Sequence, residues 1–171
     1  MACNQTLTAI LKDCSPSMGG IVEVLLAIKE DVQEVTVTDD MVSAIKMNGT
    51  GKFSKFQFPR NTGSMSSNYT IDPTTGVRFV TTDLLMSFNR MDTPKRVAIK
   101  ALAENDLVGI VKDANGKYWY LGYDEAMTAT AHDGLTGTAR ADRNGYSITL
   151  QDNSHQMPFE VKSDIIAALV A

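Results

Sequence analysis

The chain has few of the residues that define several common protein classes. It contains two cysteines, Cys3 and Cys14, and two histidines among 171 residues. Neither cysteine has a partner at zinc-ligand spacing, so the sequence predicts no metal site. It also contains no run of about 18 apolar residues, and its N-terminus lacks the basic and apolar regions of a signal peptide. We therefore expect no membrane span and synthesis in a reducing cytoplasm, where a Cys3–Cys14 disulfide would be out of place.

An excess of positive charge is also missing. The chain has 16 basic and 20 acidic residues and a net charge of −4. A protein that grips nucleic acid needs clustered Lys and Arg to displace the counterions of the phosphates. A mildly acidic surface repels DNA, and it would suit a wall along which DNA slides.

What is present is the composition of a soluble globular protein, with 43% hydrophobic and 21% charged residues. A chain of this length is most simply one domain with a core that needs no disulfide or metal. Residues 14–20, CSPSMGG, form a cluster of helix and strand breakers. We therefore expect an N-terminal arm over residues 1–20 and a single β-rich domain over residues 21–171.

The clearest local signal is a β-hairpin over residues 108–123, VGIVKDANGKYWYLGY. Its first arm is β-branched, and its second arm holds the only Trp and three of the five Tyr. Asn115-Gly116 lies between them and accepts the positive φ values of a tight turn. The pattern predicts an antiparallel pair that packs its aromatic face against the rest of the fold.

Short apolar or alternating runs predict further strands. Phe56 and Phe58 share one face of their strand, and Phe53 lies on the other. The run 65–89 is a long hairpin with its tip at residues 72–76, but neither side of its second arm is cleanly apolar, so its register is open. The predicted strands are 21–28, 34–38, 41–47, 52–58, 65–71, 77–89, 146–150 and 158–162, with a turn over 151–156.

One segment carries a helix signature. Thr93 can cap, Pro94 fits the first turn, and Ala98, Ile99 and Leu102 form an apolar stripe. Ser163-Asp164 would cap a short C-terminal helix over residues 165–170. The fold class expected from these patterns is mainly β: an antiparallel β-sandwich or barrel with one flanking α-helix and a short C-terminal helix.

Two glycine-containing segments resemble ligand loops without meeting their requirements. Residues 48–52, NGTGK, echo a phosphate loop but lack its spacing and its following helix. Residues 113–116, DANG, resemble the start of a calcium loop, but Asp124 stands where the bidentate Glu belongs, and the hairpin occupies the interval. A turn is the better interpretation of both.

The titratable residues also form no catalytic set. Asp124 and Glu125 are adjacent, so on a strand they point to opposite faces. His132 and His155 are isolated, and Arg140 and Arg143 flank Asp142 in what reads as a salt-bridged loop. The sequence therefore predicts no catalytic, cofactor-binding or metal-binding residue, and favours a binding or structural protein.

Residues 52–162 resemble a family of virion structural proteins of tailed bacteriophages, the tail tube (major tail) proteins. The resemblance is carried by FPRNTGSMSSNYTIDPTTGVRFVTTDLLMSFNRMDTPKR, LVGIVKDANGKYWYLGYD and TGTARADRNGYSITLQDNSHQMPFEV. It implies a hairpin-rich sandwich with one flanking helix. A Gly-Tyr-x-hydrophobic-Thr-hydrophobic strand follows within residues 142–150, and a Pro-containing last strand within 157–161. These motifs do not separate a tube subunit from a terminator or connector ring.

The resemblance also implies a function without catalysis. Proteins of this family form stacked rings, commonly hexameric, whose inner strands line a channel that DNA passes through without sequence-specific binding. The expected partners are further copies of the chain and other tail and connector proteins, and the expected location is the virion. Residues 1–20, 72–76 and 124–145 are then the candidates for contacts that become ordered on assembly.

Two other functions stay open on the residues alone. A monomeric β-sandwich module could bind a sugar or peptide through Tyr118, Trp119 and Tyr120. A small hydrolase could use Asp124, Glu125 or His132, and would lose its activity when one of them is replaced.

Overall fold

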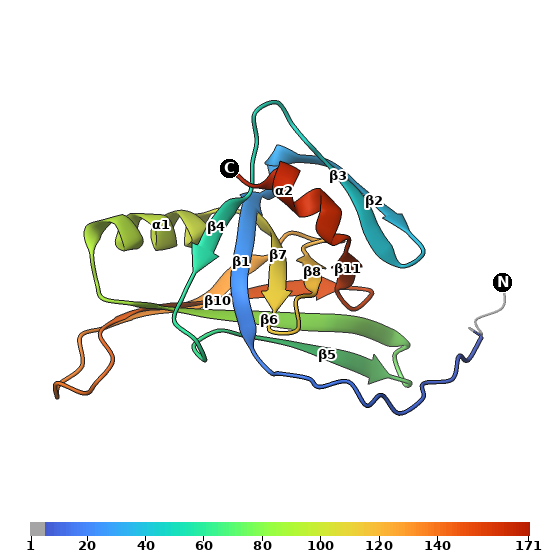
Figure 1. Ribbon diagram of the computed structural model, residues 1–171, viewed down its shortest axis with the longest axis horizontal. Helices are drawn as coiled ribbons and strands as arrows, with labels where there is room; N and C mark the ends of the chain where they lie inside the picture. The colour runs from blue at the N-terminus through green and yellow to red at the C-terminus, as the bar shows by residue number, and fades with distance from the viewer. Residues whose placement is uncertain (1–5) are drawn as a thin grey trace.

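Two β-sheets packed face to face form the body of the computed structural model, which describes residues 6–171 (Figure 1). Neighbouring strands are antiparallel except β11 and β3, which are parallel. The seven-stranded sheet has the order β2 (Val32–Thr38), β3 (Met41–Met47), β11 (Phe159–Val161), β8 (Tyr118–Leu121), β7 (Leu107–Asp113), β1 (Ile21–Ile28) and β4 (Ser54–Gln57). The four-stranded sheet has the order β5 (Ser64–Asp72), β6 (Val77–Asn89), β10 (Gly145–Ser154) and β9 (Thr128–Leu135).

The main core lies between the two sheets, so the sandwich, rather than the barrel, is the architecture that forms. Side chains from β1 and β7 on one sheet meet side chains from β6 and β10 on the other. The helix α1 (Thr93–Glu104) closes one side of this core. The fully buried residues of this main core include Val24, Leu84, Met86, Val111, Leu121, Ile148 and Leu150.

A second core lies on the other face of the seven-stranded sheet. The short helix α2 (Ile166–Leu169) and the β2–β3 hairpin cover this face (Figure 1). The central strands β1 and β7 are therefore buried on both faces, which explains their nearly continuous apolar sequences. Phe53 belongs to this second core, whereas Phe56 and Phe58 pack against the first, which confirms the predicted division of the three rings.

The predicted hairpin over residues 108–123 is confirmed as β7 and β8. The Asp113 Oδ1 atom accepts hydrogen bonds from the N–H groups of Asn115 and Lys117, each at 2.9 Å. Gly116 has φ +83°, but Asn115 does not have a positive φ, so the turn needs only one left-handed residue instead of the expected two.

Two strands differ from the prediction: β10 is longer than predicted, and β9 (residues 128–135) was not predicted as a strand. β10 continues to Ser154, so the predicted turn over 151–156 begins too early; Asp152 and Ser154 are polar but face the interior. Residues 124–145, expected as a loop or a weak ribbon, contain the eight-residue strand β9. Its backbone pairs with β10, although most of its side chains are exposed.

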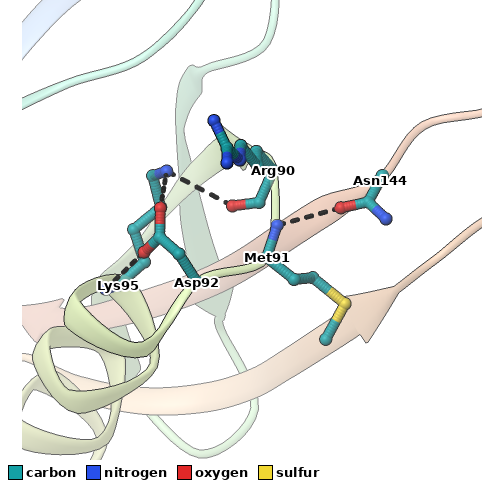
Figure 2. Close-up of polar contacts among 5 residues, drawn as sticks. All are labelled: Arg90, Met91, Asp92, Lys95 and Asn144. Carbon is teal, nitrogen blue, oxygen red and sulfur yellow. Dashed lines mark hydrogen bonds and ion pairs between the residues drawn. The ribbon is translucent and has the colours of Figure 1, made fainter.

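The residue that caps the N-terminus of α1 lies one position earlier than predicted. Asp92, and not Thr93, is the N-cap: its Oδ1 atom accepts the N–H of Lys95 at 2.9 Å (Figure 2). The Lys95 ammonium pairs with the other oxygen of Asp92 and donates to the carbonyl of Arg90 at 3.3 Å. The C-terminal helix has no side-chain cap, so the expected role of Ser163 and Asp164 is wrong.

Replacing Asp92 by Ala is expected to lower the free energy of unfolding by about 1 kcal/mol, because the Lys95 N–H loses its acceptor. Replacing Thr93 by Ala should change it by less than about 0.5 kcal/mol, because that hydroxyl does not cap the helix. Urea unfolding followed by circular dichroism measures both. Equal effects of the two substitutions would contradict the assignment of the cap.

The arm over residues 6–20 contains no helix or strand and is exposed throughout. Its last residues are held at the β7–β8 turn, where the Met18 N–H donates to Asn115 Oδ1 at 2.9 Å and the Ala114 N–H donates to the Gly20 carbonyl at 3.0 Å. Cys14 is exposed, and Cys3 lies outside the described residues, as does the predicted arm's first part, residues 1–5. Neither described helix has the length and apolar character that crossing a membrane requires.

Candidate functional site

The outer face of the four-stranded sheet is uncovered by any other element and is polar. Its inner face carries Val80, Leu84 and Met86, so the alternate positions of β6 and their partners point outward. The register sets the outward row on each strand. Most of the residues in these rows are polar, and Val77, Phe79, Leu85, Ala131 and Leu135 are the apolar ones. The rows are Ser64, Ser66, Asn68, Thr70 and Asp72 on β5, Val77, Phe79, Thr81, Asp83, Leu85, Ser87 and Asn89 on β6, Gly145, Ser147, Thr149, Gln151 and Asn153 on β10, and Thr128, Ala131, Asp133 and Leu135 on β9.

This outer face has negative charge and, among the described residues, no lysine or arginine. The three charged side chains on it are Asp83 and Asp133 and, at the end of β5, Asp72. The one basic residue within the four strands is Arg78, at an exposed end of β6 on the inward-facing row. A duplex near this face would meet hydroxyls, amides and carboxylates, none of which neutralises phosphate charge.

Hydrogen bonds between strands hold the polar side chains of the face in place. Gln151 Nε2 donates to Asp83 Oδ1 at 2.9 Å, and Thr81 Oγ1 donates to Asn153 Oδ1 at 3.1 Å. Both pairs join directly opposed residues of β6 and β10. Short side chains tied across the strands give a flat surface, since they do not extend into solvent as Lys and Arg do.

The two edges of this sheet are long and carry no protection against pairing. β5 and β9 end the strand order, so each leaves one row of backbone N–H and C=O groups unpaired. Neither strand contains Lys, Arg or Pro, the residues that monomeric proteins use to block edge-to-edge association. The edges can therefore accept a strand from another chain.

The two ends of the same sheet differ in charge. At the end where β9 starts and β10 stops, three acidic residues outnumber one basic residue. They are Asp124 and Glu125, close in sequence to β9, and Asp72 and Arg78 at the β5–β6 tip. At the opposite end lie Arg90 and the exposed loop 136–144, which protrudes from the body of the molecule (Figure 1). That loop contains Arg140 and Arg143, and Arg143 lines a hollow of about 550 Å³ together with Arg90.

The structure brings some of the catalytic candidates together but separates others. Asp124, Glu125 and His155 line one open depression of about 450 Å³, where Asp124 Oδ2 accepts the backbone N–H of His155 at 2.7 Å. His132 lines a different hollow, against α1. Within residues 6–171, no three His, Cys, Asp or Glu side chains gather as metal ligands would.

The two segments that resemble ligand loops are turns. Residues 48–51 follow β3, where the Gly51 N–H donates to the Asn48 carbonyl at 2.9 Å, and Lys52 Nζ donates to the carbonyl of Ala168. Residues 113–116 form the β7–β8 turn. Asp142 accepts the N–H groups of Thr138 and Ala139, so the loop between Arg140 and Arg143 is held by backbone contacts, and its predicted salt bridge is absent among the described ion pairs.

The aromatic candidates are mostly used by the fold. The ring of Tyr120 is 1% exposed and belongs to the second core. Trp119 is half-buried, and its Nε1 donates to Asp113 Oδ2 at 3.1 Å. Tyr118 is partly buried against the second core, and Lys112 Nζ lies 5.4 Å from the centroid of its ring. The three side chains are therefore engaged in contacts within the fold.

A buried polar contact between the sheets was missed at the sequence level. Asp152 on β10 is 3% exposed and accepts the Gly122 N–H at 3.2 Å, while Lys29 Nζ donates to the carbonyl of Gly122 at 2.7 Å. Burial raises the pKa of Asp152 and lowers the pKa of Lys29, and the opposite charge of each partly offsets the effect on the other. Nothing in the local sequence distinguishes these two residues from surface charges.

Asp152→Asn is expected to change how stability depends on pH. The folded-state pKa of Asp152 lies above the ordinary 3.8, so this carboxyl favours folding most when it is protonated. The contribution of Asp152 to the free energy of unfolding is full at a pH below the ordinary pKa and is lost as pH rises through the raised pKa. The loss is about 1.4 kcal/mol for each unit by which the pKa is raised. The stability of the native protein relative to the variant should therefore fall as pH rises.

Asp72→Asn is the control with the opposite sign. Hydrogen bonds from the backbone of Thr74 lower the pKa of this exposed carboxyl, so its contribution appears above the ordinary value and is lost on acidification. Urea unfolding of the three proteins between about pH 3 and pH 7 measures both differences. The same slope for the two variants would contradict the assignment of Asp152 as a desolvated group.

Comparison of this chain with protein-family models, with curated proteins and with solved structures finds no match.

Proposed function

We propose that the protein is a structural subunit of a phage tail that assembles into stacked rings, with the outer face of the four-stranded sheet lining the channel for DNA. The observation that carries this proposal is the polar face with Asp83 and Asp133 and without Lys or Arg. Such a wall repels phosphates weakly and offers no cation that would retain them, so a duplex can slide past it.

The free edges support a ring as the form of assembly. β5 and β9 lie at opposite edges of the same sheet, so β5 of one copy can lie beside β9 of the next. A contact between two different edges is heterologous, and it closes into a ring when each copy is rotated by a fixed angle from its neighbour. The sheet would then continue around the channel, and the hexamer implied by the family resemblance would leave neither edge of the four-stranded sheet unpaired.

The charges at the ends of the sheet support stacking of such rings. The end with Asp72, Asp124 and Glu125 would face the end with Arg90 and the loop 136–144 of the next ring. Opposite charges on the two faces orient the rings head to tail and disfavour the inverted arrangement, in which like charges meet.

Light scattering of the purified protein over a series of concentrations, with negative-stain imaging of the same samples, tests the proposal. Rings or tubes with an open centre are expected, and their formation should depend on both free edges. The variant Thr70→Pro would place a proline, which has no backbone N–H, on edge strand β5 and should reduce assembly. A protein that stays monomeric at high concentration after prolonged incubation would contradict the proposal.

A further inference from the structure

Three large apolar side chains of the N-terminal arm have no contact that shields them from water. Leu7, Ile10 and Leu11 are 98%, 97% and 84% exposed. Single exposed apolar residues are common, but three within five positions of a segment without secondary structure form a short apolar patch. Burying such side chains would stabilise a complex by about 1.5–3 kcal/mol each, before the cost of ordering the arm.

The arm joins β1 at its first residue, and an apolar groove of about 240 Å³ lies at the other end of this strand, between the edge strand β4 and the helix α1. Its walls are Leu26, Ala27 and Ile28 from β1, Phe56 from β4, and Ala98 and Leu102 from α1. The small side chains on α1 leave the space open, and Ile28 is partly exposed there. β4 ends the strand order of its sheet, so one side of its backbone is also unpaired along this groove.

The arm cannot place all three side chains in the groove of its own chain. Its attachment at Met18 lies at the β7–β8 turn, and the arm leaves this point away from α1 (Figure 1). Leu11 precedes Met18 by seven residues, whereas the groove begins at Leu26, eight residues after Met18 along the extended strand β1. A reversal of the chain would use further residues, so Leu11 would fall short of the groove.

We propose that the arm of one copy, through Leu7, Ile10 and Leu11, docks in the β4–α1 groove of a second copy. This contact requires a second copy, so it rests on the proposed self-assembly. It would be one of the contacts that hold the assembly together. An extended arm can add its backbone to the free side of β4 while its apolar side chains enter the groove, which is strand addition at an exposed edge.

The charges beside the two surfaces agree with this pairing. Lys12 follows the apolar residues of the arm, and Asp31 lies at the groove without an ion pair among the described residues. The other charged residue of the groove, Lys52, donates to the carbonyl of Ala168 at 2.9 Å. Lys12 of one copy can therefore approach Asp31 of another, while the ammonium of Lys52 is directed to the carbonyl of Ala168.

Disulfide trapping between two full-length variants tests the contact. Both carry Cys3→Ser and Cys14→Ser; one adds Ala9→Cys in the arm, and the other adds Ser54→Cys on β4 at the groove. The matched control replaces Ser54→Cys by Ser66→Cys, an exposed serine on β5. Equal amounts are mixed with oxidised glutathione as the oxidant, one chain carries a mass tag, and mixed dimers are counted on non-reducing gels.

We expect at least about tenfold more mixed dimer with Ser54→Cys than with Ser66→Cys, because docking raises the effective concentration of the two thiols. Adding Ala101→Glu, which places a charge in the groove, should remove this excess, whereas Val97→Glu, on α1 outside the groove, should retain it. Equal trapping at the two serines would overturn the inference, even if Ala101→Glu failed to fold.

Light scattering of the same mixtures separates this inference from the proposed function. Rings or tubes without preferential trapping at Ser54 would overturn the arm contact and leave the tail proposal standing. Preferential trapping in dimers that never form rings would support the arm contact and contradict the tail proposal.

Discussion

Gly145→Ala is expected to destabilise the folded chain strongly. A Cβ atom at this position would lie 1.9 Å from the carbonyl oxygen of Phe88 and 3.0 Å from its carbonyl carbon. These are backbone atoms of β6, opposite the first residue of β10, so they cannot move without separating the two strands. The expected loss is more than about 4 kcal/mol, a large part of the roughly 5–15 kcal/mol that stabilises a typical domain.

Gly19→Ala is the matched control, because a Cβ there meets nothing within 4 Å and the residue does not have a positive φ. It should change the free energy of unfolding by less than about 0.5 kcal/mol. Circular dichroism and urea unfolding of the two variants measure the difference. A Gly145→Ala protein as stable as the native one would show that the close approach of β10 to Phe88 is not required.

This close approach gives a physical reason for one motif seen in the sequence. The run that starts at Gly145 and continues with Tyr146, Ile148 and Leu150 predicts a strand by its alternation, and β10 confirms it. The pattern does not reveal why Gly comes first. The reason is a contact with Phe88, 57 residues earlier in the chain, which no local rule contains.

The bounds of several strands could be predicted from runs of apolar and β-branched residues. β1, β3 and β6 match their predicted bounds, although the outward face of β6 could not be assigned from its sequence. The predicted end of β10 comes too early because Asp152 and Ser154 are buried polar residues. Asp152 accepts hydrogen bonds from the N–H of the distant Gly122 and from the hydroxyl of Ser154. Local sequence shows the polarity of such residues but not their hydrogen bonds.

The sequence did not predict the candidate site itself; it predicted only that the chain has no catalytic, cofactor-binding or metal-binding residues. The sequence offers no set of residues that could carry out catalysis or bind a cofactor. It also does not show which face of strand 77–89 is outward, because the polar Thr82 is buried and the apolar Leu85 is exposed. The buried Thr82 is satisfied by a hydrogen bond with Ser67 on β5 at 2.8 Å. The strand order β5-β6-β10-β9 joins segments far apart in the chain, so the outer face and its lack of cations appear only after folding.

Placing lysines on that face is expected to convert it from a surface without phosphate-binding cations into one that holds DNA. In the triple variant Ser66→Lys, Asn68→Lys and Thr149→Lys, three outward positions of β5 and β10 would carry positive charge. Each ammonium that neutralises a phosphate releases a counterion, so affinity for duplex DNA should rise at least about tenfold at low salt and fall steeply with added salt.

The position of the bound DNA distinguishes a channel from an ordinary basic patch. The matched control places three lysines at Gln33, Thr36 and Thr38, exposed positions of β2 on the other sheet. DNA held inside a tube is shielded from nuclease, whereas DNA held on an outer surface is digested. Assembled samples of the two variants, mixed with short duplexes and treated with nuclease, should therefore protect DNA in the first variant and leave it accessible in the second. Equal digestion in both would place the polar face outside the channel and contradict its proposed function.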